Sequence, residues 1–408
     1  MVSKFGWIDF SEKERRQMLD VVQLFSERDT RDELGIGTIR DAFSDHFFPG
    51  TSTIQTRPKY MLLIPWMYID FEKRRTASAQ IGARARKFET DLIFTLLKNG
   101  NAEGVIGKDA KKNLVRLASN IYWAGLRSWG IRRFVGSQEQ YHRSLDFYYK
   151  AGSLVGEEAD EEFGDLKRFT NWHPGIPEPS KDFKQHASLE LSANEADYLK
   201  ERVLMLYPDS FFAQLLREKR FVKADYPWEH PVVRSLSPEL SRSLLHARNF
   251  SEVIHGAALY YNLMLSEAAE RQDWSESFNQ KMEEWKAGLG VRYVELTSWY
   301  RNLEEFWMSQ GLNTARIPTL TKAFVQKWLY FVFESPGMEN LLGDRKVQDL
   351  IASREFQLKG PRARLSNRNA LNRWRGESGT GRLIYRWGIA SVFVSDILKA
   401  KNVRPAHA

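Results

Sequence analysis

Five side chains are candidates for acid–base chemistry: Asp41, Asp45, Asp70, Glu89 and His255. A carboxylate can activate water or stabilise a developing positive charge, and a histidine can exchange a proton near neutral pH. The alternative for each acid is an ordinary role at the surface or as a helix cap. The sequence has no cysteine, which excludes disulfides, thiolate metal sites and a cysteine nucleophile.

Motifs for common cofactors and metals are absent from the sequence. It contains no Walker A loop, no Gly-x-Gly-x-x-Gly and no Gly-x-Ser-x-Gly, and its eight histidines are scattered without metal-ligand spacing. An ATPase, a dinucleotide enzyme and a serine hydrolase are therefore disfavoured. Any catalysis is expected to use carboxylates, histidine or bound water, with no metal and no cofactor.

A glycine pair near the N-terminus is a candidate phosphate-binding turn. Gly35 and Gly37 flank Ile36 and precede a predicted helix that carries Arg40. Glycines let backbone N–H groups approach a phosphate, and the positive end of the following helix favours an anion. The pattern resembles a helix-hairpin-helix element that binds DNA. The alternative is an ordinary turn, in which Gly37 precedes Thr38 as the N-cap.

A polar loop follows that helix and is a second candidate for DNA contact. It contains Thr51, Ser52, Thr53, Gln55 and Arg57. Hydroxyl, amide and guanidinium groups suit hydrogen bonds to phosphate oxygens or base edges. A solvated loop without function is the alternative.

The C-terminal 65 residues are strongly basic. Residues 344–408 contain 14 Lys and Arg against 5 Asp and Glu, whereas the formal charge of the whole chain is +8. Arginine grips phosphate in a bidentate way and aromatic rings stack on bases. We therefore expect DNA contacts here from these residues: Arg362, Arg364, Arg368, Arg373 and Trp374. The alternatives are a solvated surface and a basic segment that pairs with acidic parts of the same chain.

The apolar pattern predicts a mainly α protein with a minor β component, an α+β fold whose body is multi-helical. Residues 60–69 form an almost wholly apolar run that is interpreted as a buried strand, although Pro65 would place it at an edge. Helices are predicted over residues 11–25, 38–47, 84–97, 111–134, 238–269, 280–311 and 319–334, and a further helical region is predicted to begin after Ser192.

Composition shifts along the chain suggest four parts. They are an N-terminal α+β domain (1–151), an acidic and proline-rich connection (152–190), a helical domain (191–343) and the basic region (344–408). In the third part, Arg248, His255 and Asn262 recur every seven residues on one helix. Such a stripe can line a pocket, or it can be a hydrogen-bonded polar face.

The sequence gives no sign of a membrane protein. No apolar run reaches the roughly 20 residues that a membrane helix needs, and the first ten residues do not look like a signal peptide. We expect a cytoplasmic protein.

Three stretches resemble an uncharacterised bacterial domain-of-unknown-function family found in phage-defence loci. They are residues 31–68 (RDELGIGTIRDAFSDHFFPGTSTIQTRPKYMLLIPWMY), 104–131 (GVIGKDAKKNLVRLASNIYWAGLRSWGI) and 359–387 (KGPRARLSNRNALNRWRGESGTGRLIYRW). The chain is also similar in size and character to Brig-type antiphage DNA glycosylases. A helix-hairpin-helix glycosylase has an aspartate beyond its hairpin, at a place where this sequence has Lys59 and Tyr60.

The resemblance implies an antiphage protein that acts on phage DNA, most simply a glycosylase that excises modified bases. Base excision needs a pocket with aromatic walls for a flipped base and a carboxylate near the sugar. The alternatives are a non-catalytic DNA-binding subunit that works with other defence proteins, and a metal-independent nuclease.

Overall fold

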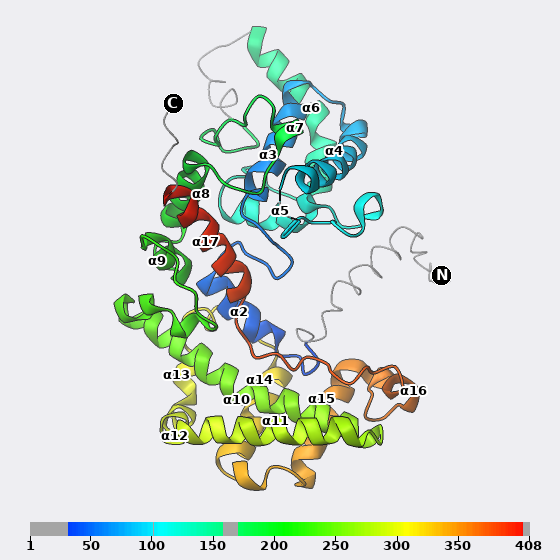
Figure 1. Cartoon of the computed structure of the whole chain (residues 1–408), viewed down its shortest axis with the longest axis vertical. Helices are drawn as coiled ribbons and strands as arrows, with labels where there is room; N and C mark the ends of the chain where they lie inside the picture. The colour runs from blue at the N-terminus through cyan, green and yellow to red at the C-terminus, as the bar shows by residue number, and fades with distance from the viewer. Residues whose placement is uncertain (1–31, 101, 158–169, 403–408) are drawn as a thin grey trace, which may run out of the picture. The chain divides into compact units, whose positions relative to one another are not determined.

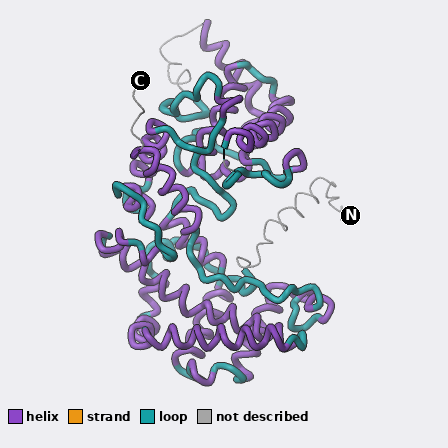
Figure 2. Tube along the Cα trace, viewed as in Figure 1, coloured by secondary structure: helices purple, strands orange, loops and turns teal. Residues whose placement is uncertain are grey.

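The computed structural model describes residues 32–100, 102–157 and 170–402. Every regular element within these ranges is a helix (Figure 2), and the only extended pairing among them is an isolated bridge between Arg132 and Trp172. The predicted minor β component is therefore wrong, and the described chain is helical. The helix predicted over residues 11–25 lies outside the described residues.

The described residues form two compact units, each built from segments far apart in the sequence. Unit 1 holds the residues up to Ser44 together with Ser237–Tyr385, and unit 2 holds Asp45–Leu236 together with the residues from Arg386 onward. The N-terminal and C-terminal parts of the chain thus contribute to both units. The helix α2 (Gly37–Phe47) contains the first point at which the chain passes from one unit to the other.

Unit 1 is organised around the 31-residue helix α10 (Figure 1). This helix packs against α11, α14 and α15. The helices of unit 1 that follow α2 are α10 (Pro238–Ala268), α11 (Gln272–Val291), α12 (Tyr293–Arg301), α13 (Leu303–Trp307), α14 (Thr319–Phe333), α15 (Arg345–Lys359) and α16 (Arg368–Leu371).

A glycine lets α10 and α11 approach closely. A Cβ atom built on Gly256 of α10 would lie 2.2 Å from the ring of Trp285 of α11. The Trp285 indole N–H also donates a hydrogen bond of 2.8 Å to the carbonyl of Glu252, one turn before Gly256. The ring is therefore held where the missing side chain leaves room for it.

We expect Gly256→Ala to lower the free energy of unfolding by about 1–3 kcal/mol, because the added methyl group overpacks this contact. Gly288→Ala on α11 is the matched control, since a Cβ there meets nothing within 4 Å. The control should be neutral or stabilise by up to about 1 kcal/mol, since alanine favours helix more than glycine does. Urea unfolding of both variants measures the difference, and equal midpoints would refute the close contact.

Unit 2 contains two groups of packed helices. In the first, α3 (Tyr60–Lys73) packs on α4 (Ser78–Asn99) and α5 (Ala118–Ser128), and α4 contacts α6 (Gln138–Glu157) and α7 (Phe183–His186). In the second, α17 (Trp387–Asn402) packs on α8 (Ala193–Leu206) and α9 (Phe211–Arg217). The helix α17 thus belongs to a unit whose other helices all precede Ser237 in the sequence.

The run predicted as a strand is most of α3. Ten residues of this helix are buried, on all sides of it. The apolar residues therefore show no helical period, and a fully buried helix cannot be told from a buried strand by pattern alone. Pro65 lies inside the helix and costs it one hydrogen bond. Burial of the surrounding side chains offsets that loss.

Local capping signals located several other helices correctly. Ser192 and Glu195 form the predicted capping box at the start of α8, and Ser237 caps α10 with Pro238 in the first helical turn. The predicted helices 38–47, 84–97 and 319–334 correspond to α2, α4 and α14. None of the helices formed by described residues is long and apolar enough to cross a membrane.

Candidate active site

Unit 2 has a pocket between α3 and the proline-rich segment before α7. Its volume is about 330 Å³, within the range typical of small-ligand sites. We name it the Trp66–Trp172 pocket. It is lined by Trp66, Ile69, Asp70, Glu72, Lys73, Thr170, Trp172, His173, Pro174, Ile176, Pro177, Glu178, Pro179 and Phe183.

Fixed aromatic rings form part of the pocket wall. The indole N–H of Trp66 donates a hydrogen bond of 2.7 Å to the carbonyl of Pro177, and the ring of Phe183 meets Trp66 edge-on at 5.6 Å. Trp172 stacks on Tyr68, with ring centroids 5.7 Å apart and planes 11° from parallel. The rings of Trp66, Trp172 and Phe183 are already ordered, but they are only 3–9 % exposed, so small parts of them face the pocket.

Glu72 is a partly buried carboxylate that lines this pocket. Its Oε1 atom accepts hydrogen bonds from the Tyr141 hydroxyl (2.5 Å), the Trp172 indole N–H (3.0 Å) and the Asn171 amide (3.1 Å). Burial raises the pKa of Glu72 above its ordinary value, although these three hydrogen bonds act in the opposite direction. A carboxyl group with a raised pKa is suited to proton transfer near neutral pH.

Asp70 holds two cations at the same pocket. Its Oδ1 lies 3.1 Å from Nε of Arg74, and its Oδ2 lies 2.8 Å from Nζ of Lys184. Lys73 also lines the pocket. Lys73 can contact an anionic group such as a phosphate ester, but Asp70, Glu72 and Glu178 also line the pocket and offset its charge.

The pocket therefore combines three chemical elements: aromatic walls, a proton-transfer group and cations. Of the acids predicted to be catalytic, Asp70 lies here. Glu72 was missed, although it lies only two residues further along α3. Trp172 was also missed, because its segment was interpreted as a connection between domains. A carboxylate at the end of a long apolar run was the available signal for Glu72.

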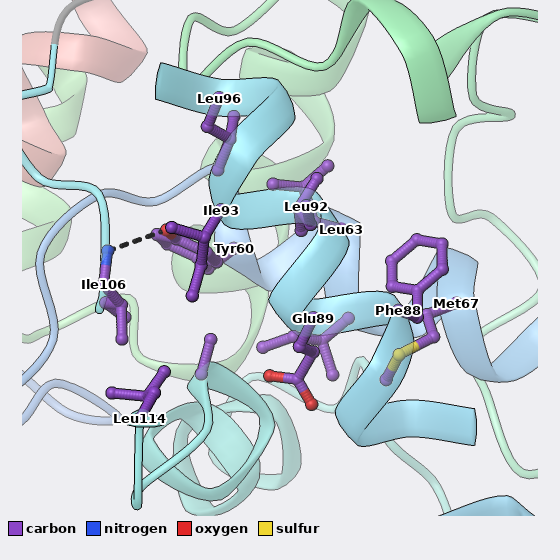
Figure 3. Close-up of a pocket in the computed structure, with 12 residues that line it drawn as sticks. Tyr60, Leu63, Met67, Phe88, Glu89, Leu92, Ile93, Leu96, Ile106 and Leu114 are labelled. Carbon is purple, nitrogen blue, oxygen red and sulfur yellow. Dashed lines mark hydrogen bonds between the residues drawn. The ribbon is translucent and has the colours of Figure 1, made fainter. Parts of the chain in front are cut away.

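A second carboxylate, Glu89, lies in a small apolar cavity of unit 2 (Figure 3). The cavity volume is about 10 Å³, roughly the room one water needs. Glu89 accepts hydrogen bonds from the backbone N–H (2.9 Å) and the hydroxyl (2.5 Å) of Ser119. Burial raises the pKa of Glu89 to about 7, although the bonds from Ser119 oppose this.

Glu89 should make stability depend on pH. Its pKa is raised in the folded protein, so the folded state binds a proton more tightly than the unfolded chain. Stability should fall as pH rises from about 4.5 to about 7, by up to about 1.4 kcal/mol per pH unit. Glu89→Gln should flatten this slope, measured as urea unfolding at pH 5 and pH 8. The same slope in both proteins would contradict the assignment.

The glycine turn lies in unit 1, and a side chain of the protein occupies its N–H groups. The carboxylate of Asp32 accepts hydrogen bonds of 2.7 Å from the backbone N–H of Ile36 and of Gly37. Gly35 adopts a positive φ of 65°, and its carbonyl accepts a hydrogen bond from Arg354. Asp32 therefore holds the place that the helix-hairpin-helix interpretation gives to a phosphate.

Arg40, the predicted cation of that turn, pairs with the adjacent Asp41 at 3.1 Å. Asp41, one of the predicted catalytic acids, thus lies next to the turn in unit 1. Asp45 lies in unit 2 and pairs with Arg386 at 2.5 Å.

Most hydrogen-bonding groups of the polar loop form bonds within unit 2. Gln55 is only 2 % exposed and donates to the carbonyl of Gly50, and the Thr51 hydroxyl donates to the carbonyl of Phe48. Ser52 donates its backbone N–H to Gln55, whereas Thr53 is exposed. Arg57 forms an ion pair of 2.6 Å with Asp396 of α17. The loop mainly joins parts of unit 2 to one another.

His255 and its stripe hold the C-terminal segment of unit 1. The His255 Nε2 lies 2.9 Å from the carbonyl of Thr380, and Asn262 exchanges hydrogen bonds with the backbone of Ser378. Burial lowers the pKa of His255 to about 4, although the bond to Thr380 opposes this. Arg248, the third residue of the stripe, pairs with Glu252.

Part of the basic region is used inside unit 1. The Arg364 guanidinium lies 3.1 Å from Oε1 of Glu33, and Lys359 pairs with both Glu33 and Glu355. Burial would raise the pKa of Glu33, but the charges of Lys359 and Arg364 outweigh it and lower the value to about 2. Glu355 is 0 % exposed. These groups form a buried charge cluster.

Other arginines of the basic region remain at the surface of unit 1. Arg362, Arg368 and Arg373 are exposed, and Arg368 pairs with Glu270 at 3.6 Å. Trp374, by contrast, is 6 % exposed and packs edge-on against Trp274, so its ring is no open stacking surface. The predicted site residues are thus divided between the two units.

In the described part of the chain, His, Asp and Glu side chains nowhere gather in threes as metal ligands do. No curated protein and no solved structure matches the chain significantly. Residues 2–401, nearly the whole chain, match the model of a family of unknown function, DUF6361. The chain therefore belongs to the DUF6361 family.

Proposed function

We propose that this protein is an antiphage DNA glycosylase that excises modified bases from phage DNA in the cytoplasm, alone or with other defence proteins. The Trp66–Trp172 pocket is its active site. The observation that carries the proposal is Glu72, a partly buried carboxylate that lines the pocket next to Trp172 and whose pKa is raised by burial. The antiphage part rests on the sequence resemblance described above.

The chemistry is the hydrolysis of an N-glycosidic bond. A flipped base enters the pocket and contacts the small exposed parts of Trp66, Trp172 and Phe183 that line it. Water adds to C1′ of the sugar as the bond from C1′ to the base nitrogen breaks. Glu72 takes the proton of that water, and the departing base takes a proton from solvent. The products are a free base and an abasic site.

The other groups of the pocket suit a nucleotide. Lys73, Arg74 and Lys184 would contact phosphates that flank the flipped nucleotide. Asp70 positions the last two of these cations and also balances their charge. In this proposal Asp70 contributes to substrate binding, whereas Glu72 carries out the proton transfer.

The test is incubation of the purified protein with phage DNA that carries modified bases and with unmodified DNA. Mass spectrometry detects free base, and alkali treatment followed by electrophoresis detects abasic sites. Free modified base together with alkali-labile sites is the expected result. Strand cuts without abasic sites would favour a nuclease instead, and binding without any product would favour a non-catalytic DNA-binding subunit.

A further inference from the structure

A loop of unit 2 carries three lysines that belong to none of the sites described above. It runs from Gly107 to Arg116, between α4 and α5. Lys108, Lys111 and Lys112 are exposed, and none of them pairs with a carboxylate of another described residue. None of the three lines the Trp66–Trp172 pocket.

The net charge of residues 1–343 as a whole does not reveal the positive charge around this loop. Residues 84–116 contain eight Lys and Arg against four Asp and Glu. Of the four acids, Glu89 is buried and Asp91 is paired with Lys87. The other two acids, Glu103 and Asp109, are exposed, and Asp109 lies in the loop itself. Cations nevertheless outnumber acids on this surface, although residues 1–343 are close to neutral as a whole. Such a local field attracts polyanions.

The loop is anchored at both ends. The backbone N–H of Ile106 donates a hydrogen bond of 3.0 Å to the hydroxyl of Tyr60, as Figure 3 shows. At the other end, the guanidinium of Arg86 donates a bond of 2.9 Å to the carbonyl of Leu114. Ile106 and Leu114 both line the cavity that contains Glu89. The loop is therefore fixed to α3 and α4, and its lysines are presented from a defined backbone.

The backbone conformation of Lys111 also indicates that the loop has a defined structure. Its φ is 47°, in the left-handed region that residues other than glycine rarely adopt, and its N–H donates 2.7 Å to the carbonyl of Gly107. This conformation costs about 1–3 kcal/mol and persists only where the surrounding structure imposes it. The turn places Lys111 and Lys112 next to each other at the protein surface.

We infer that the Gly107–Arg116 loop is a nucleic-acid surface that binds the phosphate backbone of DNA. The inference rests on the proposed function only in taking DNA as the polyanion. Lysine ammonium groups act as point charges toward phosphate and carry no sequence information. An anionic membrane is the poorer partner, because membrane-surface binding uses an amphipathic helix with a broad apolar face, and this loop has none.

The experiment uses the full-length protein with all three lysines, Lys108, Lys111 and Lys112, replaced by alanine. Fluorescence anisotropy with a labelled DNA duplex measures affinity at several salt concentrations. We expect about a tenfold or greater loss of affinity at low salt, and a salt slope smaller by about two to three units, since each lost phosphate contact removes about 0.9. A variant with arginine at the same three positions should keep the DNA affinity and the salt slope of the wild type.

Lys87→Ala is the matched control, because Lys87 is equally exposed on the neighbouring α4 but already paired with Asp91. It should leave the slope unchanged. Unaltered DNA affinity in the triple-alanine variant would overturn the inference. So would loss of binding to phosphatidylserine vesicles with DNA affinity retained, which would make a membrane the partner. This experiment measures DNA binding and not base release. A protein that binds DNA through this loop but releases no base would therefore contradict the proposed glycosylase activity and leave the present inference intact.

Discussion

Replacement of Glu72 by glutamine is expected to lower the rate of base release by about 10²–10⁴-fold, the usual contribution of a general acid or base. Glutamine has nearly the same shape and keeps an oxygen for the donors Tyr141, Asn171 and Trp172. It cannot take a proton from water. DNA affinity and the free energy of unfolding should therefore change little while kcat falls. Single-turnover release of free base measures the effect.

Asp91→Asn is the control for this prediction. Asp91 is an exposed carboxylate on α4 that pairs with Lys87, and it does not line the pocket. The control should release base at the rate of the wild type. The pH profile of the wild type should show one ionisation above the ordinary range of a glutamate, because burial raises the pKa of Glu72. Full activity of the glutamine variant would remove Glu72 from the mechanism.

Helix positions could be predicted where the signal is local. The capping box at Ser192 and the Ser237–Pro238 start involve neighbouring residues only, so the sequence contains all the information they need. The interpretation of residues 60–69 as a strand failed for the opposite reason. Their burial on every side is imposed by helices that come later in the chain, and that burial removes the helical period from the pattern.

The candidate site could be predicted only in part for a similar reason. Asp70 was identified as an acid near polar elements, but nothing beside it in the sequence distinguishes Glu72. Its distinctive environment comes from Tyr141 and Trp172, which are 69 and 100 residues away. The count of charged residues gave only part of the information about the basic region. It revealed the basic C-terminal region, but not that Glu33 and Glu355 would hold part of it in place.

The buried charge cluster of unit 1 should be the most sensitive point of its stability. Glu355 accepts hydrogen bonds from the Tyr261 hydroxyl, from Lys359 and from the backbone N–H groups of Arg364 and Leu365. Glu355→Ala would leave these donors buried without an acceptor and the positive charges unbalanced. We expect the free energy of unfolding to fall by about 3–5 kcal/mol, the usual cost of removing one partner of a buried ion pair.

Asp349→Ala on the same helix, α15, is the control, because Asp349 is exposed and should change stability by less than about 0.5 kcal/mol. The pKa of Glu355 is lowered because its hydrogen bonds outweigh the effect of burial. The wild type should therefore lose this stabilisation as pH falls below the ordinary range of a glutamate, and the alanine variant should lose less, because its remaining acids, Glu33 among them, still respond to pH. Urea unfolding at pH 7 and pH 4 distinguishes the two. A Glu355→Ala protein as stable as its control would mean that other contacts, such as the pairs of Lys359 and Arg364 with Glu33, hold the basic region in unit 1.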